Sequence, residues 1–178
     1  MKEIIKYAFI LGLICFLASS VLAFVNGITE PQIKAQQARE EGSSLREVMA
    51  QSSDFKPYYE GDKIIYYDAY DSKGQLNGFV LKTQVKGYSS TIEALVGLNL
   101  KLEIVDTKIL SQNETPGLGS RILEPSFLGQ LRGRNLDTFN QVQAITGATV
   151  SSSALLHSLQ DKIAQLKDTL LQEVHNGR

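Results

Sequence analysis

The sequence predicts an α+β fold, in which an antiparallel sheet packed with helices is preceded by a single N-terminal transmembrane helix. Three features carry this prediction: an uncharged apolar run near the N-terminus, a series of short β-prone runs, and a long amphipathic stretch after them. A helix laid on a sheet is one of the few layer arrangements that bury a core. A length of 178 residues allows one ordinary domain with short appendages.

The charge balance and the cysteine count exclude several classes of protein. The 18 Lys and Arg residues face 19 Asp and Glu residues, a net charge of −1, so we expect no nucleic-acid partner. One cysteine and two histidines exclude a disulfide framework, an iron–sulfur cluster held by this chain alone, and the usual zinc spacings. Cys15 lies in the apolar run and is interpreted as a small hydrophobe. Redox chemistry would therefore need an organic cofactor.

Residues 7–25 carry no charge, and about 20 such residues are what a helix needs to cross the hydrocarbon of a membrane. The alternative is a cleaved signal peptide, with Lys2 and Lys6 as its basic head and 21–23 as its cleavage site. We favour an uncleaved anchor because the apolar run continues through Phe24 and Val25.

Basic residues flank this run on both sides, but Lys2 and Lys6 lie closer to it than Lys34 and Arg39. We therefore expect a single-pass protein of the cell inner (plasma) membrane with a cytoplasmic N-terminus and its bulk on the extracytoplasmic (periplasmic) side. The expected parts are a cytoplasmic head (1–6), a transmembrane helix (7–25), a helical stalk (26–52) and a folded domain (53–178).

Four β-prone runs in the segment from about Lys63 to Lys108 predict a strand meander with antiparallel pairing. They are IIYYDAY, FVLKTQV, ALVGLNL and KLEIVDTKIL. Before them, 31–49 is typical of a charged helix with a weak interruption at 42–44, and after them 111–143 is rich in loop residues. A long helix from about Val150 follows, with apolar residues at helical spacing. These are Ala154, Leu155, Leu159, Ile163, Leu166, Leu170 and Val174.

Two segments have the composition of a ligand site. The first is Thr146-Gly147-Ala148-Thr149-Val150-Ser151-Ser152-Ser153, which leads into the last helix. Small residues allow close approach of a ligand, hydroxyls offer hydrogen bonds, and a helix start supplies unpaired N–H groups, which together suit a phosphate. An ordinary helix cap explains this segment alone equally well.

The second segment is Glu114-Thr115-Pro116-Gly117-Leu118-Gly119, where a proline stiffens the backbone and two glycines leave space. Such a loop suits close approach to a flat ring. Taken alone, it is more typical of a tight turn with a solvated Glu114.

The order of anchor, strand meander, ETPGLG and TGATVSS before a helix resembles one family over nearly the whole chain. This is the FMN-binding family represented by the G subunit of the Rnf electron-transport complex, and the C subunit of the sodium-pumping NADH:quinone oxidoreductase is a more distant relative. The helix start near Thr29-Glu30-Pro31 and Gly87-Tyr88 before the 94–100 run belong to the same resemblance.

The resemblance implies covalent FMN, joined to Thr149 through a phosphoester bond by a flavin transferase that uses FAD. It also implies a cofactor-binding role for other residues of the two motifs and for one tyrosine. These are Thr146, Gly147, Ala148, Ser151, Ser152, Glu114, Thr115, Pro116, Gly117, Leu118, Gly119 and Tyr88. The family usually has an acidic residue three positions before the motif, where this chain has Gln143, so weaker modification of Thr149 is expected if that carboxylate is used.

The implied function is electron relay within an Rnf-type complex that couples ferredoxin/NAD electron transfer to ion translocation, in which this chain is a redox subunit and not a catalyst by itself. The implied partners are the other subunits, the flavin transferase and membrane lipid. Two alternatives stay open: a flavin-binding sensor without electron relay, and a phosphate-ligand or assembly module that has lost its flavin. His157 and His175 are expected to be exposed or partly packed.

Overall fold

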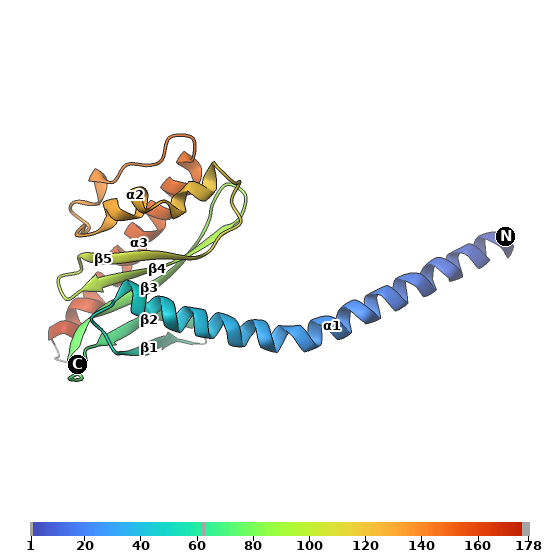
Figure 1. Ribbon diagram of the computed structural model, residues 1–178, viewed down its shortest axis with the longest axis horizontal. Coiled ribbons are helices and arrows are strands. Elements are labelled where there is room, and N and C mark those ends of the chain that lie inside the picture. The colour runs from blue at the N-terminus through green and yellow to red at the C-terminus, as the bar shows by residue number, and fades with distance from the viewer. Residues whose placement is uncertain (1, 62, 176–178) are drawn as a thin grey trace. The chain divides into compact units, whose positions relative to one another are not determined.

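The computed structural model describes residues 2–61 and 63–175. The chain divides into two compact units, one ending at Glu41 and one beginning at Gly42. In Figure 1 the first unit is the long blue helix, and the second contains the sheet and the remaining helices. The predicted fold class, an antiparallel sheet with helices and an apolar N-terminal helix, is confirmed.

Helix α1 runs from Lys2 to Val48 without a break, although Pro31 lies inside it. Its N-terminal part is long and apolar enough to cross a membrane, and its side chains there are exposed in the structure. The helix expected from Pro31 onward is thus the continuation of the apolar helix. Residues 42–44 do not interrupt it, because the turns that follow bury Leu45 and Val48 against the sheet.

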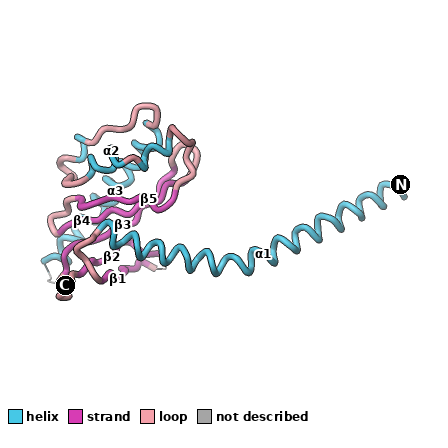
Figure 2. The backbone as a smooth tube through the Cα atoms, in the orientation of Figure 1, coloured by secondary structure: helices cyan, strands magenta, loops and turns pink. Residues whose placement is uncertain are grey.

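Five strands form one sheet in the order in which they occur in the chain, and every neighbouring pair is antiparallel. The strands are β1 (Asp54–Glu60), β2 (Lys63–Tyr70), β3 (Leu76–Lys86), β4 (Thr91–Asn99) and β5 (Ile104–Ser111). Figure 2 shows this meander in magenta. Tight turns join the hairpins; for example, the Asp71 carboxylate accepts hydrogen bonds from the backbone N–H groups of Lys73 and Gln75.

The four predicted strands correspond to β2–β5, whereas β1 was not predicted. Strand β1 is an edge strand whose side chains are nearly all exposed, and it contains Pro57. It therefore lacks the alternation of apolar and polar residues that marks a half-buried strand. Its Tyr58 ring stacks on Tyr66 of β2 at a centroid distance of 4.7 Å, which helps to cover the core.

The two faces of the sheet are buried unequally. Leu45 and Val48 at the end of α1, with Met49 directly after it, cover one face and pack on Val80 and Leu95. Helix α3 (Thr149–His175) covers the other, larger face, and the predicted stripe on it is buried except for Ala154 and Val174, which are half-buried. The buried members of the stripe are Leu155, Leu159, Ile163, Leu166 and Leu170.

Residues between β5 and α3 form short helices that close the end of the larger core. They are η1 (Gly119–Leu123), α2 (Pro125–Leu128), η2 (Gly129–Leu131) and η3 (Phe139–Gln141). Ile122, Phe127, Leu131 and Phe139 from these turns join the core of the sheet and α3. The region predicted as loop-rich is therefore packed, and it carries the second motif against the start of α3.

Candidate functional site

The first motif forms the turn into α3. Gly147 has φ +83°, a conformation that suits glycine, and the helix begins at Thr149. The Ser152 hydroxyl donates to the Ala148 carbonyl (2.8 Å) and accepts from the Ile145 N–H (3.0 Å). Thr149 itself is exposed, and its hydroxyl makes a long 3.4 Å contact to the Ile145 carbonyl. The turn therefore presents the Thr149 hydroxyl to solvent beside the first N–H groups of a long helix.

The second motif is a compact turn that leads into η1. The Thr115 carbonyl accepts from the Leu118 N–H (3.1 Å) and the Ser120 N–H (3.2 Å). Gly117 has φ +75°, and its N–H donates to the Ser120 hydroxyl (2.9 Å). This turn buries Gly119 and leaves the Leu118 side chain 52% exposed.

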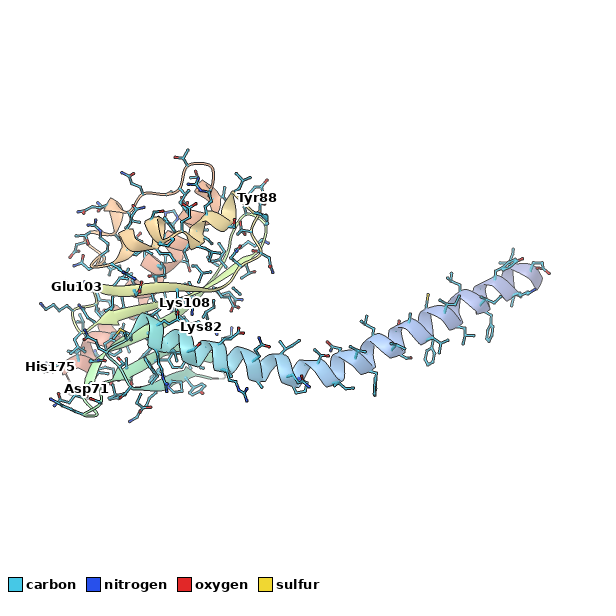
Figure 3. All side chains as sticks on the ribbon, in the orientation of Figure 1. Asp71, Lys82, Tyr88, Glu103, Lys108 and His175 are labelled. Atoms are coloured by element: carbon cyan, nitrogen blue, oxygen red, sulfur yellow. The ribbon has the colours of Figure 1, made fainter. Side chains whose placement is uncertain are left out.

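A pocket of about 360 Å³, here called the motif pocket, lies where the two motifs meet the turn between β3 and β4. Its lining residues are Tyr88, Thr115, Leu118, Gly119, Gly147, Ala148, Thr149, Val150 and Ser151. Tyr88 lies at the tip of the β3–β4 hairpin, at the far end of the sheet from Asp71 and His175 (Figure 3). The volume of the motif pocket falls in the range of small-molecule sites.

Exposed apolar side chains surround the motif pocket, one from each of its three segments. Tyr88 is 72% exposed, Leu118 52% and Val150 57%. Val150 was not among the predicted site residues, although an apolar residue directly after Thr149 was a visible signal in the sequence. Large apolar groups held at a concave surface are typical of binding sites.

Five of the predicted site residues do not line the motif pocket: Glu114, Pro116, Gly117, Thr146 and Ser152. Pro116 and Gly117 shape the turn, and Ser152 is buried within the first turn of α3. The carbonyl of Thr146 accepts a hydrogen bond from the Arg121 guanidinium (3.0 Å), and Arg121 also pairs with Glu124 (2.8 Å). These residues lie behind or beside the pocket and not in its lining.

Glu114 is only 5% exposed and is not the solvated turn residue that its loop alone would suggest. Its carboxylate accepts hydrogen bonds from the backbone N–H groups of Tyr88 (3.2 Å), Ser89 (3.1 Å) and Ser90 (2.8 Å). It also accepts from the Ser90 hydroxyl (3.1 Å) and the Ser151 hydroxyl (2.5 Å). The carboxylate therefore joins the hairpin turn, the second motif and α3.

Burial is the largest single influence on the pKa of Glu114 and by itself would raise it. The hydrogen bonds from Ser151, Ser90 and Ser89 together outweigh burial and hold the pKa below its ordinary value. Glu114 is therefore a buried carboxylate that stays ionised near neutral pH.

Two glycines make room for this carboxylate. A Cβ on Gly87 would lie 2.6 Å from Glu114 Oε1, and a Cβ on Gly119 would lie 2.5 Å from Glu114 Oε2. Side chains at these positions would collide with the carboxylate or displace it. Gly119 also lines the motif pocket.

Gln143 and Glu124 lie near the first motif, in a smaller hollow of about 270 Å³ that also includes Thr146. The Gln143 backbone N–H donates to the Gln130 side chain (3.1 Å), and the Gln143 residue is exposed. The acidic group in this hollow is Glu124, whose pKa is lowered chiefly by its hydrogen bond from Arg121. His157 and His175 are exposed on α3, away from the lining of the motif pocket.

A second cavity of about 370 Å³, here called the edge groove, lies beside β5. It is lined by Glu47, Val48, Asp106, Thr107, Lys108, Ile109, Leu123, Pro125, Leu128, Gly129 and Arg132. Lys108 pairs with Glu47 (2.6 Å), and Arg132 pairs with Asp106 (2.7 Å). Arg132, from the segment that was predicted to be rich in loop residues, thus contacts β5.

Comparisons with known proteins agree with this geometry. A family model described as FMN-binding domain matches residues 87–164, and one described as RnfG N-terminal region matches residues 1–48. The first match begins at the hairpin turn that carries Tyr88 and includes both motifs. The two matches together cover the apolar helix and the whole motif pocket.

Relatives with similar sequences extend over nearly the same length. The G subunit of the ion-translocating oxidoreductase complex of Methanosarcina acetivorans is 31% identical over 176 residues, covering 91% of this chain and 94% of that protein. The G subunit of the proton-translocating ferredoxin:NAD(+) oxidoreductase complex of Clostridium ljungdahlii is 29% identical, and the match covers 88% of each protein.

Among solved structures, the C subunit of a Na(+)-translocating NADH-quinone reductase from Parabacteroides distasonis matches with a TM-score of 0.53. The match has 17% identity and covers 67% of this chain and 78% of that chain. At this identity, the likeness supports the fold.

Proposed function

The chain belongs to the family of G subunits of ion-translocating Rnf-type complexes, and from this premise we propose that it is an FMN-carrying electron-transfer subunit whose FMN is phosphoester-linked to Thr149. The observation that carries the proposal is the position of the Thr149 hydroxyl. It lies exposed in the lining of the motif pocket, at the start of a 27-residue helix. A nucleophile and an anion-binding helix start therefore meet at one point of the pocket.

The residues of the motif pocket fit FMN in two ways. The first N–H groups of α3 and its dipole would stabilise the negatively charged phosphodiester. Tyr88, Leu118 and Val150, whose exposed side chains line the pocket, would contact the flat ring. When bound, FMN would supply transfer of one or two electrons, which the side chains of this chain cannot provide.

The attachment step balances with FAD as the donor. A bond forms between Thr149 Oγ and the phosphorus of the FMN half of FAD, the pyrophosphate bond breaks, and AMP leaves. The hydroxyl proton passes to a base of the flavin transferase. Since Thr149 Oγ makes only a 3.4 Å contact to a carbonyl, little hydrogen bonding within the described chain opposes its use as the nucleophile.

The decisive experiment is the intact mass of the full chain produced with the flavin transferase, compared with Thr149→Ala. We expect a gain of one esterified FMN in the wild type and none in the variant. Thr146→Ala is the matched control, because Thr146 is an exposed threonine of the same motif that lies outside the pocket lining. FMN retained by Thr149→Ala and lost by Thr146→Ala would contradict the assignment.

The same experiment tests whether Gln143 is tolerated. Full modification of the wild-type chain would show that a carboxylate at position 143 is not needed. If Gln143→Asp is modified faster than the wild type, the natural glutamine at position 143 slows attachment without preventing it. If only Gln143→Asp is modified, covalent attachment is lost in this chain.

Electron relay requires that the bound flavin be reducible. We expect the absorbance of the flavin in the purified chain to bleach on reduction and to return on reoxidation. A bound flavin that cannot be reduced at any accessible potential would favour the sensor alternative over relay.

We further propose that α1 anchors the chain in the cell inner membrane with a cytoplasmic N-terminus, so that residues 53–178, the FMN-binding domain, lie on the periplasmic side beside other subunits of the complex. The apolar run of α1 supports the anchor, and Lys2 and Lys6 support the orientation. A cysteine at exposed position 63, in a Cys15→Ala background, should react with an impermeant reagent added outside the cell. Its protection in intact cells would reverse the orientation.

A further inference from the structure

The walls of the motif pocket come from three segments that are distant in the sequence. They are the hairpin turn 87–90, the second motif 114–119 and the first turn of α3. Each contributes one exposed apolar side chain to the pocket, namely Tyr88, Leu118 and Val150. The shape of the pocket therefore depends on how these segments are fixed to one another.

One buried side chain contacts both of the other segments. The Glu114 carboxylate accepts hydrogen bonds from three successive N–H groups of the hairpin turn, those of Tyr88, Ser89 and Ser90. On its other side it accepts the Ser151 hydroxyl of α3 at 2.5 Å. Its own backbone belongs to the second motif. One more contact, between the hydroxyls of Ser89 and Thr115 (3.1 Å), also joins two of the segments.

We propose that Glu114 is the positioning residue of the motif pocket: its carboxylate fixes the hairpin turn, the second motif and the start of α3 relative to one another, so that Thr149 meets the flavin phosphate in a preformed site. This inference rests on the proposed function. It assigns Glu114 a role behind the pocket wall and not a contact with the cofactor.

The chemistry of the side chain explains why a carboxylate occupies this position. An ionised carboxylate offers two oxygens and only accepts hydrogen bonds, and here the surrounding groups are N–H and O–H donors. A glutamine of nearly the same size would place an NH₂ group against these donors. Gly87 and Gly119 enclose the carboxylate so closely that it has little freedom to shift.

Ser151 transmits this constraint to the attachment residue. It lies two positions after Thr149 in the same helical turn, it is 1% exposed, and it lines the motif pocket. If the Ser151 contact is lost, the start of α3 is free to move, and Thr149 moves with it. Small misplacements of a reacting atom cost large factors in rate.

The test measures the rate of FMN attachment to the full chain by the flavin transferase with saturating FAD, at several chain concentrations. We expect Glu114→Gln to lower the saturating rate about tenfold. The chain concentration that gives half of this rate should change less than about twofold, because a buried side chain offers the transferase no contact surface. Ser151→Ala removes one donor only and should lower the saturating rate about threefold.

Glu93→Gln is the matched control, because Glu93 also accepts a hydrogen bond, from Gln84 (2.8 Å), but lies on β4 outside the pocket lining. It should be modified at the wild-type rate. Circular dichroism establishes that each variant is folded. If Glu114→Gln fails to fold, Ser151→Ala decides the question.

A folded Glu114→Gln chain with the wild-type saturating rate would overturn the positioning role. If Glu114→Gln does not fold, a wild-type saturating rate for Ser151→Ala would overturn it instead. An increase in the half-saturating concentration without a change in the saturating rate would also overturn it, in favour of a role in transferase binding. A folded wild-type chain that is not modified at all would overturn the proposed function itself, whatever the variants do.

Discussion

The motif pocket and the edge groove have nearly the same volume, about 360 and 370 Å³, but their linings differ in kind. The motif pocket is lined by glycines, small hydroxyl residues and exposed apolar side chains, and its acidic neighbour Glu114 is hidden behind the wall. The edge groove displays Asp106 and Arg132, which pair with each other. Volume alone therefore does not identify a ligand site; the groups left available in the lining do.

We expect the largest difference between the two cavities in the stability contributed by their carboxylates, Glu114 and Asp106. Glu114→Gln should lower the free energy of unfolding by about 3 kcal/mol, because a buried acceptor of several hydrogen bonds is replaced by a group that partly donates. Asp106→Asn should cost less than about 1 kcal/mol, since its partner Arg132 is largely exposed. Urea unfolding of the full chain in detergent measures both. Equal losses of unfolding free energy in the two variants would contradict the distinction between the buried Glu114 and the exposed ion pair of Asp106.

Low pH should destabilise the chain at the motif pocket by protonating Glu114. The folded-state pKa of Glu114 lies below its ordinary value of 4.5, so the stability that it contributes is fully present above about pH 4.5. This contribution is lost as the pH falls through the folded-state pKa. Unfolding measurements below pH 4.5 should therefore show a smaller acid-dependent loss in Glu114→Gln than in the wild type. Parallel pH profiles would mean that other carboxylates dominate acid unfolding.

Replacing a glycine by alanine in each cavity tests how much space lies behind its lining. Gly119→Ala places a Cβ 2.5 Å from the Glu114 carboxylate and should cost about 2 kcal/mol of stability. It should also lower FMN attachment. Gly129→Ala, in the edge groove, meets no atom within 4 Å and has a helical φ of −62°, so it should be neutral or slightly stabilising. Thermal unfolding and intact mass report both quantities.

We expect the smallest effect when an exposed apolar residue of either cavity is replaced by alanine. In chain produced without the transferase, Tyr88→Ala should weaken the binding of added FMN about fivefold through loss of an aromatic contact. Leu123→Ala removes a half-exposed apolar side chain from the edge groove and should leave FMN affinity unchanged. Fluorescence titration measures both, and a loss with Leu123→Ala alone would move the binding site to the edge groove.

Much of the fold could be predicted from residue patterns. Strands β2–β5 and helix α3 follow periodic burial, and the predicted start of the last helix near Val150 differs from the observed Thr149 by one residue. Strand β1 escaped prediction because an exposed edge strand with Pro57 has no apolar alternation. The short helices between β5 and α3 escaped because each is too short to show a period.

The site was only partly predictable. Both motifs were visible as small-residue segments, and the structure brings them together with Tyr88, which is far from both in the sequence. The burial of Glu114 had no local signal, because a glutamate before Thr-Pro-Gly in a polar loop is usually solvated. Its partners lie 24 to 37 positions away in the chain, and only the folded chain brings them together.

The order in which the chain is made has a consequence for the maturation of the pocket. Thr149 begins α3, yet the larger face of the sheet stays uncovered until Leu155, Leu159, Ile163 and Leu170 have docked on it. The Ser151 contact to Glu114 therefore cannot be secured while α3 is still being synthesised. Under the proposed function, attachment of FMN to Thr149 is therefore expected to follow folding of the domain, since an unfinished chain would present the motif but not the pocket.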